Sequence, residues 1–331
     1  MDTKHYIGID IASKKFDASI FKNNAKNWPH KIFSNSITGF KALLKWLPDD
    51  IENLHICMEA TGIYWEDLAN FLYKQGIKVS VVNPYIIKNY AHAQMIRSKT
   101  DKLDCKTIAR FVAKEQPSAW QPLPVAQQKL NRQLKHLSHL KDCVAKERIR
   151  LHSLRDEEAI QNTKAILVLL EEQLKQFESV MRKTIQEDEM LRNNLKLLQT
   201  IPAVGINSAM WLLATLGNGS RFKNGKAAAT YMGLTPMEHQ SGSSINGKAR
   251  ISKMGNSHVR HILYLPVMAF SFGRYQDCCY KPFVNNLLAK GKPKKVILVA
   301  LMRKIVVIAQ TLLQRQTAFD ENIFTGALKA H

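Results

Sequence analysis

The chain of 331 residues is 45% hydrophobic and carries a formal net charge of +21, a composition that predicts two or more globular domains. So large a positive excess indicates an anionic polymer or a membrane surface as the partner. Five cysteines, an odd number with no CxxC pair, argue against a disulfide framework and against a zinc ribbon.

The first part of the chain predicts a mixture of strands and helices. Short apolar or alternating runs predict strands at residues 6–10, 16–21, 32–34, 54–59 and 79–83. Helices are expected at residues 38–46, 64–75 and 101–114. Three consecutive strands before the first helix favour an RNase H-like (RuvC-like) α/β domain with a mixed sheet over a doubly wound Rossmann sheet.

The middle of the chain predicts long helices, because apolar residues recur there at heptad-like spacing. The two runs are Leu130, Leu134, Leu137, Val144 and Leu151, then Leu170, Leu174, Phe177, Met181, Leu191, Leu195 and Leu198. Polar residues 155–162 separate the runs, so an antiparallel hairpin or an oligomerising coiled coil is favoured over one continuous rod. Dimerisation and simple packing within the chain are both open at this point.

Prolines and charge suggest where the domains end. We expect an α/β domain at 1–115, a linker at 116–126, a helical coiled-coil region at 127–198 and a mainly α domain at 199–331. The last of these carries 17 basic and 4 acidic side chains, so it holds most of the net positive charge, +13 of +21. Its apolar stretch at 296–313 is interrupted by Arg303 and Lys304, which predicts a buried helix rather than a membrane span. With no apolar signal core at the N-terminus, a cytoplasmic protein is expected.

Four carboxylates stand at positions that suggest a metal site. Asp10 and Glu59 each end a predicted strand, so both emerge at one edge of the sheet if the two strands are neighbours. Asp101 and Asp104 are three residues apart at a predicted helix start, which aims both toward one point. Carboxylates repel phosphate unless a divalent cation such as Mg²⁺ lies between them. The pattern therefore predicts metal-assisted attack on a phosphodiester.

Each of these acids is also common in ordinary, non-catalytic positions. Asp101 and Asp104 at a helix N-terminus are typical of a cap followed by an acid that the helix dipole favours. A lone acid at a strand end, such as Asp10 or Glu59, is typical of a solvated turn. The metal site is favoured by the combination of all four acids with the motifs around them.

Several short motifs together resemble those of one known family. They are Gly8-Ile9-Asp10, Glu59-Ala60-Thr61-Gly62-Ile63-Tyr64, Val82-Asn83-Pro84, Lys99-Thr100-Asp101-x-x-Asp104, Ser241-Gly242-Ser243-Ser244 and Ile251-Ser252-Lys253-Met254-Gly255-Asn256. In this combination the chain resembles the DEDD transposases of bacterial insertion sequences, which are bridge-RNA-guided recombinases related to the Piv-type DNA invertases. The resemblance covers nearly the whole chain. Two positions differ from the family pattern: Cys105 stands where alanine is common, and Ala203 where glycine is common.

The resemblance implies both a fold and a chemistry. It implies a RuvC-like N-terminal domain whose four carboxylates, Asp10, Glu59, Asp101 and Asp104, bind Mg²⁺. It implies a C-terminal transposase domain in which Ser241 is the nucleophile that forms a covalent link to DNA. The implied partners are donor and target DNA, a guide (bridge) RNA and further copies of the chain, in a dimer or tetramer whose active site can be shared between subunits.

The residues around Ser241 are equally typical of a flexible loop. Serine and glycine at 241–244 are common in linkers, and residue type alone does not distinguish Ser241 from Ser243 or Ser244. A serine hydroxyl is a weak nucleophile until a base or a metal helps to deprotonate it. Basic side chains expected to hold phosphates are Lys248, Arg250, Lys253, Arg260, Lys292, Lys294 and Lys295. The last three belong to a stretch that is also typical of a merely solvated loop.

Two further motifs each fit more than one structure. Residues 201–205, Ile-Pro-Ala-Val-Gly, are similar to a helix-hairpin-helix turn whose backbone amides face a phosphate, and a plain interhelical turn fits nearly as well. His136 and His139 have the spacing of a metal-binding pair. No nearby cysteine or acid completes a site, so a packed or solvated helix face is favoured.

The leading hypothesis is a site-specific DNA recombinase that cuts and rejoins DNA through a 5′-phosphoserine intermediate, with guidance by RNA implied by the resemblance alone. A second hypothesis is a RuvC-like, metal-dependent endonuclease in which activated water cuts the DNA. A third is a nucleic-acid-binding protein that has a degenerate nuclease fold and no catalysis.

Overall fold

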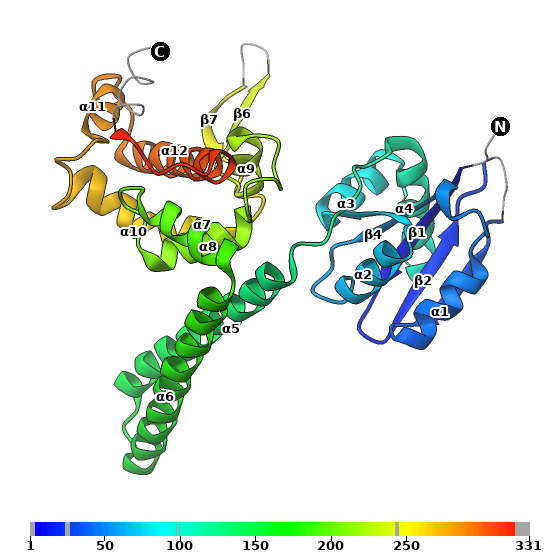
Figure 1. Ribbon diagram of the computed structural model, residues 1–331, viewed down its shortest axis with the longest axis horizontal. Coiled ribbons are helices and arrows are strands. Elements are labelled where there is room, and N and C mark those ends of the chain that lie inside the picture. Colours follow the sequence, from blue (N-terminus) through cyan, green and yellow to red (C-terminus); the bar gives the residue numbers. More distant parts are fainter. Residues whose placement is uncertain (1–3, 24–26, 97, 99, 242–244, 322–331) are drawn as a thin grey trace. The chain divides into compact units, whose positions relative to one another are not determined.

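The computed structural model describes residues 4–23, 27–96, 98, 100–241 and 245–321, and only the backbone of residues 238–241 and 245–250. The chain divides into two compact units, Met1–Pro122 and Leu123–His331 (Figure 1). Each unit has its own hydrophobic core, which is expected for a chain of this length.

The first unit is built on a mixed five-stranded sheet. Its strands are β1 (His5–Ile11), β2 (Lys15–Ile20), β3 (His30–Ser34), β4 (Leu54–Glu59) and β5 (Lys78–Val82). Their order across the sheet is β3-β2-β1-β4-β5. β1 pairs antiparallel with β2 and parallel with β4, and β4 pairs parallel with β5. The predicted mixed α/β sheet, with three strands before the first helix, is confirmed.

Helices cover both faces of this sheet (Figure 1). They are α1 (Ile37–Trp46), α2 (Glu66–Lys74), α3 (Pro84–Ala93) and α4 (Asp101–Glu115), with a short 3₁₀ turn, η1 (Ile51–Asn53). α1 and α2 share a core with the isoleucines of β1, and α3 and α4 form a second core with Cys57 of β4. The sequence analysis did not predict α3. Its start signal is the Asn83 side chain, which accepts a hydrogen bond from Tyr85 N and is followed by a proline at the first helical position.

The start of the expected linker is fastened to the edge strand β5. Trp120 N donates to Val79 O at 2.7 Å, and Ser80 Oγ lies 3.0 Å from Pro117 O and 2.9 Å from Ser118 O. The Trp120 ring also packs edge-on against Trp65, with 5.6 Å between the ring centroids. Residues 117–120 are therefore part of the first unit.

The second unit begins with a long helical hairpin, α5 (Val125–Ser153) and α6 (Glu157–Glu187) (Figure 1). Three contacts show that the two helices run antiparallel: Gln133 Nε2 to Thr184 Oγ1 (3.0 Å), Lys141 Nζ to Glu178 Oε1 (3.1 Å) and Arg148 Nη2 to Glu171 Oε1 (2.6 Å). These contacts confirm the predicted antiparallel hairpin and exclude one continuous rod. Coiled-coil packing between subunits stays a prediction.

The histidine pair lies on the first helix of this hairpin. The His136 ring packs edge-on against Phe177, with 4.6 Å between the centroids, and His139 Nε2 lies 3.6 Å from Cys143 Sγ. In the part of the chain that the structure describes, no group of three His, Cys, Asp or Glu side chains is arranged to hold a metal ion. The interpretation of this pair as a helix face agrees with these contacts.

The rest of the second unit packs around the C-terminal helix. Its elements are α7 (Glu189–Gln199), α8 (Ile206–Leu216), α9 (Gly225–Tyr231), β6 (Pro236–Ser241), β7 (Ile245–Ile251), α10 (Ser257–Phe272), α11 (Lys281–Ala289) and α12 (Lys294–Arg315). Among the described residues, α12 alone is long and apolar enough to cross a membrane, but 56% of its apolar window is buried inside the protein. Ile297, Leu301 and Ile305 are fully buried, so α12 is the predicted buried helix.

Candidate active site

Asp10 and Glu59 are neighbours on one face of the sheet. β1 and β4 are parallel and Ile9 is paired with Met58, so the next residue on each strand, Asp10 and Glu59, stand side by side. Ile9 and Met58 belong to the core beneath α1 and α2, and side chains alternate along a strand. Both carboxylates therefore project to the other face, toward α4. Thr61 Oγ1 donates a hydrogen bond to Glu59 Oε1 at 2.8 Å and orients it.

Helix α4 crosses β1 at Gly8. A Cβ at Gly8 would lie 2.1 Å from Ala109 N and 2.2 Å from Cys105 O, so only glycine lets the helix backbone approach the strand this closely. Cys105 is buried in the contact, and burial raises the pKa of its thiol to about 12. Cys105 is thus a packing residue rather than a nucleophile. The close approach fixes the first turn of α4 beside the end of β1.

The first turn of α4 carries the other two acids. Thr100 is the N-cap, and its Oγ1 accepts a hydrogen bond from Leu103 N at 3.2 Å. Asp101 and Asp104 follow within the helix, where the positive end of the helix dipole favours them. Because Thr100 already caps the helix, N-capping does not explain why aspartates stand at positions 101 and 104.

The electrostatics of Asp10 show that the four acids lie near one another. Burial raises the pKa of Asp10 to about 6, and the charges of four further acids add to the effect, in the order Asp104, Asp101, Glu59 and Asp17. A cation that binds among these carboxylates reduces their mutual repulsion and stabilises the ionised form of Asp10. The structure thus brings the four predicted residues to one edge of the sheet.

Sequence reasoning missed three residues at this edge. Asp17 is paired with Asp10 across β1 and β2 and is only 3% exposed. His30 Nε2 lies 2.8 Å from Asp17 Oδ1, and Lys15 Nζ lies 3.6 Å from Asp17 Oδ2. Lys15 also donates to Asp101 Oδ2 at 2.8 Å, a hydrogen bond that raises the pKa of Lys15. Polar residues at alternate positions of β2, Lys15 and Asp17, could have indicated that they belong to the site. The same pattern is also typical of a solvent-facing strand.

The donor set at this edge suits a hard divalent ion, since every candidate ligand is a carboxylate oxygen. The side chains, as they lie, do not surround one point: within the described ranges no three of them form a metal-holding group. Asp101 is instead hydrogen-bonded to Lys15. The chemistry of the donors thus suits a divalent ion, while the side chains as they lie do not form a metal site.

Ser241 belongs to the second unit, where it ends β6. It is paired with Ile245, the first residue of β7, so Ser241 itself lies at the end of a strand. Gly242, Ser243 and Ser244 lie outside the described residues. Lys248 and Arg250 lie in β7, where the structure describes the backbone alone.

The other predicted phosphate-binding side chains differ in their surroundings. Lys253 has a left-handed backbone (φ +53°), and its N donates to Gly233 O at 3.2 Å. Arg260 Nη1 donates to Met232 O at 2.8 Å, so this side chain joins α10 to the C-terminal end of α9, and burial lowers the pKa of Arg260. The lysines at the start of α12 are exposed: Lys292, Lys294 and Lys295.

The Ile-Pro-Ala-Val-Gly segment forms the turn between α7 and α8. Its Ala203 is buried and has a left-handed backbone with φ +69°, a conformation that suits glycine. Tyr280 Oη donates to Pro202 O at 2.9 Å and fastens the turn to the core.

We expect Ala203→Val to lower the free energy of unfolding by about 2–3 kcal/mol, because a β-branched residue at positive φ clashes with its own backbone and overfills a buried position. Ala203→Gly should change it by less than about 0.5 kcal/mol, since the relief of strain offsets the lost methyl group and the gain in unfolded-chain entropy. Urea denaturation of the three proteins measures both effects. Equal stability of the valine variant would contradict the left-handed turn.

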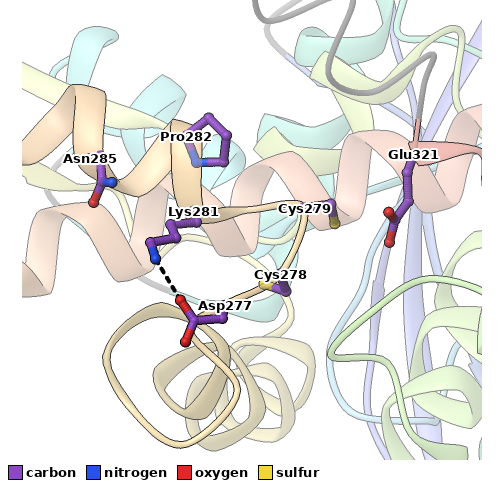
Figure 2. Close-up of a pocket in the computed structure, with 7 residues that line it drawn as sticks. All are labelled: Asp277, Cys278, Cys279, Lys281, Pro282, Asn285 and Glu321. Atoms are coloured by element: carbon purple, nitrogen blue, oxygen red, sulfur yellow. Dashed lines mark hydrogen bonds and ion pairs between the residues drawn. The ribbon is translucent and has the colours of Figure 1, made fainter.

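A pocket of about 890 Å³ opens in the second unit beside two adjacent cysteines. Figure 2 shows its lining residues: Asp277, Cys278, Cys279, Lys281, Pro282, Asn285 and Glu321. Burial raises the pKa of Cys279 to about 12, so its thiol stays protonated at neutral pH and is a poor nucleophile. The four predicted metal ligands all belong to the first unit, and we assign this pocket no part in their chemistry.

Comparison with known proteins identifies relatives over nearly the whole chain. Residues 7–157 match a DEDD family model of IS110 type described as a transposase, and residues 195–278 match one described as the IS116/IS110/IS902 transposase family. The chain is 37% identical to the pilin gene-inverting protein of Moraxella bovis over 330 residues, covering 97% of this chain and 99% of that protein. It is 22% identical to the transposase for insertion sequence element IS1328 of Yersinia enterocolitica over 357 residues, covering 95% and 98%.

Proposed function

The chain belongs to the IS116/IS110/IS902 family of transposases, and from this premise we propose that it is a site-specific DNA recombinase with a serine nucleophile and a Mg²⁺ site. The pilin gene-inverting relative is named for inverting DNA, and the IS1328 relative for transposition. Both activities cut and rejoin DNA strands. The observation that carries the proposal is the gathering of Asp10, Glu59, Asp101 and Asp104 at one edge of the sheet, where they perturb one pKa.

The carboxylates in this proposal hold a divalent ion against the DNA backbone. Asp10 and Glu59 supply oxygens from neighbouring strands, and Asp101 and Asp104 supply them from the first turn of α4. When bound, Mg²⁺ polarises the phosphate and stabilises the charge that develops on the attacking and leaving oxygens. Gly8 sets the distance between strand and helix on which this arrangement depends.

Ser241 is the proposed nucleophile. Its Oγ gives up its proton and attacks the scissile phosphorus, the bond between phosphorus and the 3′ oxygen breaks, and the 3′ oxygen takes up a proton, so no net proton is gained or lost. The product is a 5′-phosphoserine link and a free 3′ hydroxyl. In the reverse step a 3′ hydroxyl from another strand attacks this link and releases the serine. Each phosphodiester bond is exchanged for another, so rejoining needs no external energy source.

The partners of the proposal follow from the charge and the family. The second unit contains residues 199–331, whose 17 basic and 4 acidic side chains suit the phosphates of donor and target DNA. The proposed contacts include the exposed lysines at the start of α12. A guide RNA and a dimer or tetramer, with Ser241 supplied to the acids of another subunit, complete the proposal. RNA that co-purifies with the protein and carries sequence from beside its own gene would support this guidance.

Serine variants test the nucleophile directly. The substrate is a labelled plasmid that carries the gene of this protein with its flanking DNA. Wild-type protein should form an adduct with DNA that resists denaturation, and Ser241→Ala should abolish both the adduct and cleavage. Ser243→Ala and Ser244→Ala are matched controls that should keep both. Cleavage that persists in Ser241→Ala would support the second hypothesis, in which activated water cuts the DNA.

A further inference from the structure

We propose that Lys15 is a built-in counter-cation of the acidic edge and competes with a divalent ion for Asp101. The inference rests on the proposed function, because it assumes that Asp101 binds such an ion. Lys15 Nζ lies 2.8 Å from Asp101 Oδ2 and 3.6 Å from Asp17 Oδ2. One ammonium group thus joins a carboxylate on β2 to a carboxylate in the first turn of α4.

The position of Lys15 is set by its neighbours in the sheet. Lys15 opens β2, and Asp17 lies two residues further along, so the two side chains project to the same face. Asp17 is nearly fully buried, and its other oxygen contacts His30 Nε2 at 2.8 Å. This buried aspartate, held from two sides, keeps the ammonium of Lys15 beside Asp101. Lys15 is therefore a positioning residue for Asp101.

The arrangement has opposite effects with and without a divalent ion. Without one, the ammonium reduces the repulsion between carboxylates that gather at this edge. A divalent ion that approaches Asp101 meets a positive charge already bonded to its ligand, and the two cations repel each other. The side chains of Lys15 and Asp101 are 48% and 57% exposed, so the ion pair is weak enough to exchange. Lys15 thus weakens metal binding without preventing it.

Binding of Mn²⁺ to the full-length protein tests the inference, with free Mn²⁺ measured by electron paramagnetic resonance. Lys15→Met is expected to bind Mn²⁺ about five-fold more tightly than wild type, because a competing charge is gone. Lys15→Arg keeps the charge and should bind like wild type. Lys14→Met is the matched control: within the described residues, no ion pair joins this exposed neighbour to a carboxylate. Circular dichroism confirms that each variant is folded.

Thermal unfolding provides a second readout. Lys15→Met should melt at a lower temperature than wild type without Mn²⁺ and at the same temperature with saturating Mn²⁺. Mn²⁺ should therefore raise the melting temperature of Lys15→Met by more than it raises that of wild type. If Lys15→Met binds Mn²⁺ no more tightly than wild type while Asp10→Ala loses binding, the competition is overturned and the metal site stands. If wild type itself binds no Mn²⁺, both the competition and the proposed metal site are overturned.

Discussion

Asp10→Asn is expected to abolish strand cleavage and also to make the protein more stable at neutral pH when no divalent ion is present. The loss of activity should be about 1000-fold or more, because the amide carries no charge to hold the ion. The gain in stability comes from removing an unfavourable charge. Burial and the neighbouring acids raise the pKa of Asp10 to about 6, which means that its ionised form is destabilised in the folded protein.

The pH dependence of this effect has a definite sign. The pKa of Asp10 is raised from 3.8 to about 6 on folding, so between these values the folded protein binds more protons than the unfolded chain. The contribution of Asp10 to stability is fully present below about pH 4 and is lost as the pH rises through 6. Asp10 is only partly buried, so solvent screening limits the loss at pH 7 to about 1–2 kcal/mol.

Denaturation of the metal-free proteins at pH 4 and pH 7 measures the predicted stability change. Asp10→Asn should exceed wild type at pH 7 and approach it at pH 4. Asp49→Asn makes the same chemical change at an exposed position after α1 and should alter stability little at either pH. An Asp10→Asn protein that is less stable than wild type at pH 7 would contradict the crowding of negative charge at this edge. Retained cleavage would contradict the metal site.

Gly8→Ala is expected to lower the free energy of unfolding of the first unit by about 3 kcal/mol or more and to abolish cleavage. The added Cβ would lie 2.1 Å from Ala109 N and 2.2 Å from Cys105 O, and both are backbone atoms that cannot rotate away. Helix α4 must therefore shift from β1. Asp101 and Asp104 would move with its first turn, so the effect on cleavage should exceed what lost stability alone produces.

Denaturant titration gives the stability change, and Mn²⁺ binding at a temperature where the variant is folded gives the effect on the site. Gly205→Ala is the control, because its Cβ would meet no atom within 4 Å and its φ of −77° suits alanine. It should cost less than about 1 kcal/mol. A Gly8→Ala protein as stable as this control would mean that α4 does not pack against β1 so closely.

The sequence was sufficient to place Asp10 and Glu59 because each follows an apolar strand, and parallel neighbouring strands end at the same edge. The burial of Asp17 at this edge could not be predicted in the same way. When polar residues such as Lys15 and Asp17 lie on one face of a strand, that face is normally exposed to solvent, yet Asp17 is buried. Only the packing of neighbouring elements decides whether a polar face is solvated, and packing is not visible in the periodicity of one strand.

The second unit shows the same division between local signals and tertiary structure. Heptad spacing predicted the helices of the hairpin, and the contact of Arg148 with Glu171 then showed that the two helices run antiparallel within one chain. Strand β6, which ends at Ser241, was not predicted, because a sequence of serine and glycine from residue 241 onward is typical of a linker. Helix α3 was also missed, although the Asn83-Pro84 pair is a recognised start signal.

The attachment of residues 117–120 to β5 has a consequence for how the sheet behaves toward strands of other molecules. An uncovered outer strand offers free amide and carbonyl groups to any similar strand that comes near, and this leads to aggregation. Here the Trp120 amide bonds to Val79 and the Trp120 ring covers the neighbouring surface. At the opposite margin, β3 is only five residues long and carries the exposed Lys31, which discourages pairing by its charge. Both outer strands of the sheet are therefore protected against pairing with a strand of another molecule.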